Sequence, residues 1–260
     1  RGGTGTCRHL FPMSALKSFP TGLNAVIVGA SGGIGSEFVR QLAADARVAR
    51  VHALSRTRVE SRDDKVLPIS INFDDEASIR LAAEEAASGG DIDIVVVATG
   101  ILHRGSTLHP EKSLRDIDPA AMLDVFRTNT IGPALVAKHF LPRFRRNSKT
   151  VFAALSARVG SIGDNRLGGW MSYRASKSAL NMILKTLSIE HARRFPGAVV
   201  AGLHPGTVDT RLSAPFQRRV PDGKLFSPQQ SVAYMLSVID RLTPSDTGGF
   251  FAWDGTSIEY

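Results

Sequence analysis

The chain has 260 residues, of which 43% are hydrophobic and 22% are charged, and its formal net charge is +8. This composition is that of an ordinary globular protein with a large core. It excludes a membrane-spanning protein, because no apolar run approaches the roughly 20 residues that cross a bilayer.

The first twelve residues read differently from the rest of the chain. They are rich in Gly, Thr and Arg and lack the apolar core of a signal peptide. Met13 looks like a natural start, so we expect residues 1–12 to be an upstream extension or a vector remnant, and residues 13–260 to form a single domain. The one cysteine, Cys7, lies in the extension. We therefore expect no disulfide framework, no thiolate metal site and a cytoplasmic protein.

The positive charge raises the question of a nucleic-acid partner. The basic residues are spread along the chain, and only 7% of residues are aromatic, without a stripe that alternates with the arginines. Solvated helix ends and loops explain this pattern better than a nucleic-acid surface, so we expect no nucleic-acid partner.

The first predicted element is a buried strand over residues 24–28, followed by a glycine turn and an amphipathic helix over 36–44. The turn has the spacing G-x-x-x-G-x-G. Its glycines permit a tight turn, a close backbone approach and close helix packing, and the helix N-terminus favours a phosphate. A flexible surface loop is the alternative. The predicted cofactor contacts here are Gly29, Ser31, Gly32, Gly33, Ile34 and Gly35.

A second strand over residues 50–54 ends in Ser55-Arg56-Thr57-Arg58. In a dinucleotide site, an acidic residue at this place accepts a hydrogen bond from a ribose 2′-hydroxyl, whereas an arginine pairs with a 2′-phosphate. No acid is present, so Ser55 and Arg56 favour NADP(H) over NAD(H). An exposed loop arginine is the alternative.

Two more strands follow, over residues 66–71 and 93–98. Asn72 and Phe73 come directly after the first of them, and Phe73 is expected either against an adenine ring or in the core. Asp74 or Asp75 is expected to cap a helix that runs to residue 87. The second strand ends at Ala98, Thr99 and Gly100, which we expect beside the cofactor.

The middle of the chain contains a loop over residues 101–118 and a long helix predicted over 119–140. His103 and His109 lie in the loop without a third ligand at suitable spacing, so we predict loop residues and no metal site. Asn129 lies inside the helix, where an asparagine competes with backbone hydrogen bonds and needs a specific reason.

The remaining elements complete an alternating pattern. Strands are predicted over 150–155, 198–203 and 249–253, helices over 172–194 and 228–241, and a polar, basic, mobile flap over 211–226. The pattern predicts an α/β fold: one Rossmann-type, doubly wound domain with a parallel sheet of about seven strands and helices on both faces. Trp170, Leu167, Phe216 and Phe226 suggest an apolar pocket or simple packing.

Tyr173 and Lys177 are four residues apart and so share one helix face. A free phenol has a pKa of about 10 and is a poor acid or base at neutral pH. A nearby ammonium lowers that pKa, and Ser156 at the end of the fifth strand can donate to a carbonyl oxygen. The pair alone could be two exposed helix residues without a functional role, but together with Ser156 and the glycine turn it predicts acid–base chemistry.

In this order, the motifs Gly29-x-x-x-Gly33-x-Gly35, Asn129, Ser156, Tyr173-x-x-x-Lys177 and Pro205-Gly-x-Val-x-Thr210 resemble the short-chain dehydrogenase/reductase family over residues 24–254. The segments 173–182 and 249–255 resemble its C-factor and sniffer-like branch more narrowly.

The resemblance implies an NADP(H)-dependent oxidoreductase that acts on a small carbonyl or alcohol. It implies that Tyr173 is the acid/base, that Lys177 lowers its pKa and holds the nicotinamide ribose, that Ser156 polarises the substrate oxygen and that Asn129 supports a water near Lys177. It implies that Pro205, Gly206, Val208 and Thr210 contact the nicotinamide and pyrophosphate. It also implies a homodimer or homotetramer, with helices 119–140 and 172–194 as the interface.

Two positions depart from the family pattern. Val28 replaces a threonine before the first glycine, and Val97-Ala98-Thr99-Gly100 replaces Asn-Asn-Ala-Gly. We interpret these changes as a coupled exchange of a polar link for apolar packing. The resemblance leaves a second reading open, a C-factor-like signalling protein that binds a dinucleotide and turns over little.

Overall fold

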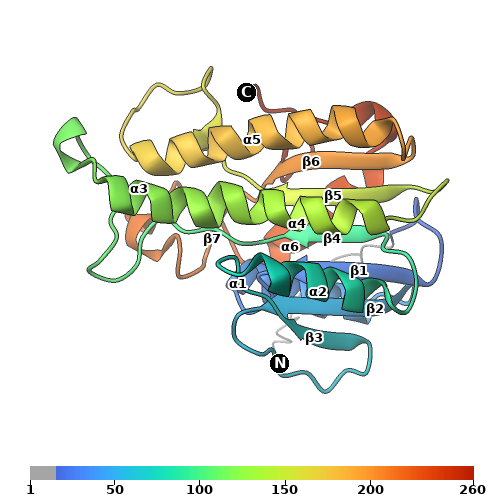
Figure 1. Ribbon diagram of the computed structural model, residues 1–260. Helices are drawn as coiled ribbons and strands as arrows, with labels where there is room; N and C mark the ends of the chain where they lie inside the picture. Colours follow the sequence, from blue (N-terminus) through green and yellow to red (C-terminus); the bar gives the residue numbers. More distant parts are fainter. Residues whose placement is uncertain (1–15) are drawn as a thin grey trace, which may run out of the picture.

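A seven-stranded sheet, all parallel, forms the centre of the protein, with strand order β3-β2-β1-β4-β5-β6-β9 (Figure 1). The computed structural model describes residues 16–260. The sheet strands are β1 (Leu23–Val28), β2 (Val48–Ser55), β3 (Val66–Ser70), β4 (Ile94–Val97), β5 (Thr150–Leu155), β6 (Ala198–His204) and β9 (Phe250–Ala252). The predicted fold class is confirmed. The expectations for residues 1–12, Met13 and Cys7 lie outside the described residues.

Helices cover both faces of the sheet, because the central strands carry apolar side chains on both sides. In β1, Ala25 and Ile27 face α1 (Gly33–Ala44) and α6 (Pro228–Arg241), whereas Val26 and Val28 face the opposite layer. That layer holds α2 (Glu76–Ala87), α4 (Gly132–Phe140) and α5 (Met171–Ala192), which lie in front of the sheet in Figure 1. None of the helices within residues 16–260 is both long and apolar enough to cross a membrane.

The long helix predicted over 119–140 is interrupted. It consists of α3 (Pro119–Phe126), a π-helical turn (Arg127–Ile131) and α4. Asn129 lies in that turn, where its amide donates to the Ile101 carbonyl (2.9 Å) and the Ser176 hydroxyl (3.1 Å) and its oxygen accepts from the Ile101 N–H (2.8 Å). These bonds supply the specific reason that a mid-helix asparagine needs.

The predicted flap has more regular structure than its composition indicates. A 3₁₀ segment (Ala214–Arg219) is followed by β8 (Leu225–Phe226), which pairs in parallel with β7 (Thr207–Val208). Phe226 is buried in β8 against Tyr234 and Trp253, with ring centroids 5.7 and 4.7 Å away. Of the two alternatives for Phe226, a pocket or simple packing, the structure shows packing, because this aromatic cluster holds it between the β7–β8 pair and α6.

Candidate active site

Two adjoining cavities open at the carboxyl edge of the sheet. The outer cavity, about 550 Å³, lies beyond β2 and β3, and the inner cavity, about 770 Å³, reaches the ends of β5 and β6. Nine residues line both cavities: Ser31, Gly32, Arg56, Ala98, Thr99, Gly100, Ile101, Arg104 and Arg211. The shared wall makes one continuous groove at the place where open α/β sheets bind ligands.

The glycine turn forms part of this wall. Gly29 has φ +88°, and a Cβ at Gly35 would lie 2.1 Å from the Gly29 carbonyl oxygen, so both positions require glycine. Gly35 therefore serves helix packing and does not line either cavity. The first turn of α1 has no side-chain cap, and Gly33 and Ile34 line the inner cavity. This arrangement suits a phosphate at the helix N-terminus.

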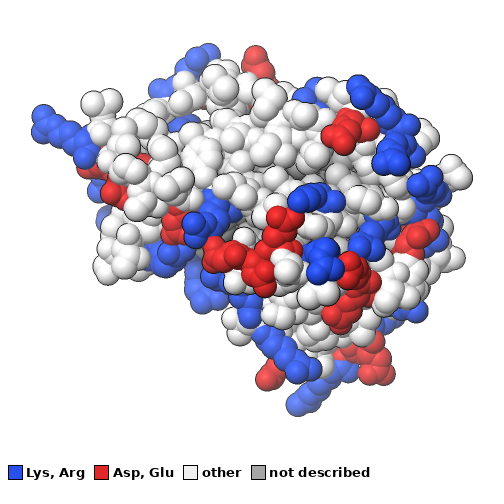
Figure 2. Space-filling model, in the orientation of Figure 1, with Lys and Arg blue, Asp and Glu red and all other residues white. Residues whose placement is uncertain are grey.

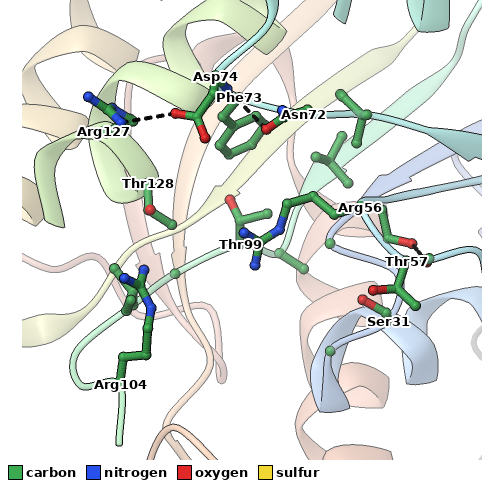
Figure 3. Close-up of a pocket in the computed structure, with 18 of the residues that line it drawn as sticks. Ser31, Arg56, Thr57, Asn72, Phe73, Asp74, Thr99, Arg104, Arg127 and Thr128 are labelled. Carbon is green, nitrogen blue, oxygen red and sulfur yellow. Dashed lines mark hydrogen bonds and ion pairs between the residues drawn. The ribbon is translucent and has the colours of Figure 1, made fainter. Parts of the chain in front are cut away.

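Arginines are concentrated in the outer cavity (Figure 3). Arg104 pairs with Asp124 (2.7 Å) and Arg127 with Asp74 (3.1 Å). Arg56 extends toward Thr99 and forms no ion pair with any residue of 16–260. Its guanidinium is therefore available for an anion in the cavity.

The other predicted residues of the outer cavity are also in its wall. The Ser55 hydroxyl donates to the Thr57 carbonyl, and the Asn72 side-chain oxygen accepts from the Asp74 N–H (3.1 Å). Phe73 lines the cavity and also packs against α4, since a Cβ at Gly132 would lie 2.0 Å from its ring. Of the two candidate caps for α2, Asp75 is the one that accepts the helix N–H.

Tyr173 and Lys177 line the inner cavity from the first two turns of α5. Both are buried, and the Lys177 Nζ lies 5.9 Å from the centre of the Tyr173 ring while donating to the Leu155 carbonyl (2.7 Å). Burial raises the pKa of Tyr173 to about 12 and lowers the pKa of Lys177 to about 7. The expected lowering of the tyrosine pKa is therefore absent from this structure, because desolvation opposes charge on both groups.

Ser156 completes this part of the inner cavity from the end of β5. Its hydroxyl donates to the Asn181 side-chain oxygen (2.7 Å). A hydroxyl has one proton to donate, so Ser156 must rotate away from Asn181 to donate to a substrate oxygen. Asn129 is buried behind the cavity, where it holds the backbone at Ile101.

In the turn after β6, some residues line the inner cavity and others pack behind it. Pro205 and Thr210 line the inner cavity, and the Thr210 methyl would lie 3.0 Å from a Cβ at Gly33. Gly206, with φ +77°, packs against the Phe226 ring, and Val208 is buried in β7. Neither residue lines a cavity, so the turn reaches the groove only at its two ends, Pro205 and Thr210.

His103 and Arg104 both line the inner cavity, although neither was assigned to the site from the sequence. His103 was expected to be a loop residue; it lines the cavity, and its Nε2 lies 3.1 Å from the carbonyl oxygens of Arg211 and Leu212. Trp170 and Phe216 pack together beside it, with ring centroids 4.8 Å apart, whereas Leu167 is 92% exposed. Neither Trp170 nor Phe216 lines either cavity, so the structure shows these two residues in an aromatic cluster with His103, outside the cavity walls.

The departures from the family pattern lie side by side. Val28 and Val97 are register partners in β1 and β4, and both are buried in the same core. Their juxtaposition fits a coupled exchange for apolar packing. The Thr99 hydroxyl, two residues beyond Val97, is buried and has no partner within residues 16–260.

Within residues 16–260, no group of three or more His, Cys, Asp or Glu side chains is placed to hold a metal ion.

Comparisons with known proteins agree with this fold. A family model described as short chain dehydrogenase matches residues 23–220. The chain is 38% identical to the C-signal protein of Myxococcus xanthus over 148 residues, which cover 57% of this chain and 84% of that protein. The NADPH-bound carbonyl reductase from chicken fatty liver superposes with a TM-score of 0.79 at 27% identity, over 92% of this chain and 100% of that chain. Carbonyl reductase Sniffer of Drosophila melanogaster shares the fold, with a TM-score of 0.77 at 21% identity over 92% and 100% of the two chains.

Proposed function

The chain belongs to the short-chain dehydrogenase family of oxidoreductases, and from that premise we propose that it reduces a small carbonyl compound, or oxidises the alcohol in reverse, with NADP(H) and Tyr173 as acid/base. The observation that carries the proposal is that Ser156, Tyr173 and Lys177 share one wall of a cavity continuous with the dinucleotide groove.

The groove suits NADP(H) at each end. The uncapped first turn of α1 and the adjacent Gly32 favour the pyrophosphate, and Arg56 without a carboxylate favours the 2′-phosphate. When bound, NADPH supplies a hydride to the carbonyl carbon. The similar carbonyl reductase from chicken fatty liver has NADPH bound, which supports the same choice here.

The residues of this chain then supply the proton. Tyr173 donates its hydroxyl proton to the carbonyl oxygen while Ser156 orients that oxygen, so the carbon gains a hydride and the oxygen a proton. Burial raises the pKa of Tyr173 to about 12, which keeps the phenol protonated, as the reductive direction requires. Lys177 would hold the ribose hydroxyls of the bound cofactor, and it would stabilise the phenolate that remains on Tyr173.

A panel of aldehydes, ketones and quinones tests this proposal. We expect NADPH oxidation with at least one member of the panel and formation of the matching alcohol or hydroquinone. Consumption of NADPH without a reduced product, or binding of NADPH without any turnover across the panel, would contradict it.

The similarity to C-signal supports a second candidate, a signalling protein that binds a dinucleotide and turns over little. The Ser156, Tyr173 and Lys177 set favours catalysis, because a protein that only binds does not require an acid. The substitution Tyr173→Phe separates the two, since a signalling function that needs only the bound dinucleotide would survive it.

Substitution of Arg56 tests the cofactor preference. We expect Arg56→Ala to weaken NADPH binding by about 10- to 100-fold, the value of a charge-assisted contact, and to change NADH binding little. Arg58→Ala is the matched control, because Arg58 is an exposed neighbour that lines neither cavity. Binding measured by fluorescence titration checks this; equal losses for both cofactors would place Arg56 away from the 2′-phosphate.

We also propose self-association through the face formed by α3, α4 and α5. Leu123, Ile131, Met182 and Ile189 are exposed along it, and Figure 2 shows few charged side chains over the middle of α5. Met182→Glu is expected to convert a dimer or tetramer to a smaller species in sedimentation velocity. The control is Leu81→Glu on α2, since Leu81 is 55% and Met182 66% exposed. A wild-type monomer at micromolar concentration contradicts the assembly.

A further inference from the structure

The helix that carries Tyr173 begins without a cap of its own. The residue at its N-cap position is Trp170, whose indole cannot accept a hydrogen bond from the helix and makes none. Trp170 has φ 51°, ψ 43° and follows two glycines at φ +64° and +66°. A tryptophan in the left-handed region is unfavourable unless its surroundings hold it there.

Glu111, from the loop between β4 and α3, takes the place of the missing cap. Its carbonyl accepts the Trp170 N–H (2.7 Å). Its two carboxylate oxygens accept the Ser172 N–H (3.3 and 3.2 Å), and one of them also accepts the Ser172 hydroxyl. Glu111 is the acceptor in each of these hydrogen bonds, and the residue is 6% exposed. A buried acid 61 residues upstream thus holds the turn that presents Tyr173.

The Glu111 carboxylate also affects Tyr173 through its negative charge. The charged or titratable groups that line the cavity with Tyr173 are Arg56, His103, Arg104, Lys177 and Arg211, and all are bases. On the flanking elements, Arg174 points to the carbonyls of residues 159, 168 and 169, and Asp124 of α3 pairs with Arg104.

The positive end of α5 adds to these bases and favours a phenolate. Glu111 contacts that helix end, one residue before Tyr173, with the opposite charge. A negative charge there favours the protonated phenol, which is the form that donates a proton to a carbonyl.

We propose that Glu111 is a positioning residue that caps α5 from outside the helix and whose negative charge acts together with burial to favour the protonated phenol of Tyr173; this rests on the function proposed above. Because Glu111 lies in the loop that also carries His103, the same loop holds both the catalytic helix and the backbone of the segment at 211–212.

The decisive variant is Glu111→Gln, which keeps an acceptor for the Ser172 N–H and removes the charge. We expect the pKa of Tyr173 to fall by about 0.5 to 1 unit, so that the phenolate fraction at a fixed alkaline pH rises about 3- to 10-fold. Phenolate absorbance measures it directly: the chain has three tyrosines, and subtraction of the matching Tyr173→Phe spectrum isolates Tyr173. Circular dichroism defines the pH range over which each variant is folded.

Two further variants separate the effect of the Glu111 charge from the effect of its hydrogen bonds to the start of α5. Asp118→Asn removes the charge from the cap of α3, whose side chain accepts the Ala121 N–H (2.7 Å), and should leave the Tyr173 titration unchanged. Glu111→Ala should lose the helix contact as well, and lower kcat more than Glu111→Gln does.

An unchanged or raised Tyr173 pKa in Glu111→Gln overturns the proposal, as does an equal shift in Asp118→Asn. The titration needs no turnover, so its result stands apart from that of the carbonyl panel.

Discussion

The variant Tyr173→Phe is expected to bind NADPH with wild-type affinity and to reduce the carbonyl substrate on the order of 10² to 10⁴ times more slowly. The substitution removes one oxygen and keeps the ring, so the contact with Trp170 at 6.3 Å between centroids is retained. The proton donor is lost, and the rate loss is the typical contribution of general acid catalysis. Steady-state kcat and a fluorescence titration of NADPH measure the two effects separately.

Tyr234→Phe provides the matched control for this experiment. Tyr234 packs against Phe226 and Trp253, with ring centroids 5.7 and 5.0 Å away, and lines neither cavity. Its loss of a hydroxyl should leave kcat unchanged. A Tyr173→Phe variant that binds NADPH and turns over at the wild-type rate would show that Tyr173 is not the acid.

The variant Lys177→Met is expected to lose activity and gain stability, in a pH-dependent way. Activity should fall on the order of 10²-fold and NADPH affinity should weaken, because Lys177 supports both the phenolate and the ribose. The free energy of unfolding should instead rise in this variant. Burial lowers the pKa of Lys177 from 10.5 to about 7, so the charged lysine is unfavourable in the folded state, and methionine removes that cost.

The sign of the pH effect follows from proton binding. Between pH 7 and 10.5 the unfolded chain holds the Lys177 proton and the folded chain has released it, so the free energy of unfolding rises with pH through this window. From pH 6 to pH 9 this one group contributes a rise of about 2 to 3 kcal/mol. Denaturant unfolding should show that Lys177→Met removes that part of the rise. Parallel pH curves for the two proteins would mean that Lys177 titrates normally.

The sheet and the shared helix face of Tyr173 and Lys177 were predictable because their signals are local. Strands such as β5, with a continuous apolar run, and the four-residue spacing of Tyr173 and Lys177 need only the pattern of neighbouring residues. The π-helical turn at Asn129 was not predictable in form, because the side chain of Asn129 bonds to the backbone of Ile101, 28 residues away, and no local pattern shows that contact.

Long-range contacts also decide the parts of the site that were missed. Nothing near Glu111 in the sequence marks it as a cap, since the helix N–H that it accepts belongs to Ser172, 61 residues downstream. Phe226 is a residue type that commonly lines apolar pockets, and only its aromatic cluster with Trp253 explains its place in β8. The buried surroundings of Tyr173 reverse the effect expected from Lys177, because desolvation depends on the whole fold.

The central claim is that this chain transfers a hydride from NADPH to a carbonyl carbon with Tyr173 as the proton donor. A single-turnover reaction with NADPH deuterated at the transferred position tests it most directly, using a carbonyl from the panel and mass spectrometry of the product. We expect one deuterium on the carbinol carbon with the wild type, and labelling on the order of 10² to 10⁴ times slower with Tyr173→Phe saturated with the same cofactor. Product without deuterium, or equal rates of labelling in the two proteins, would contradict it.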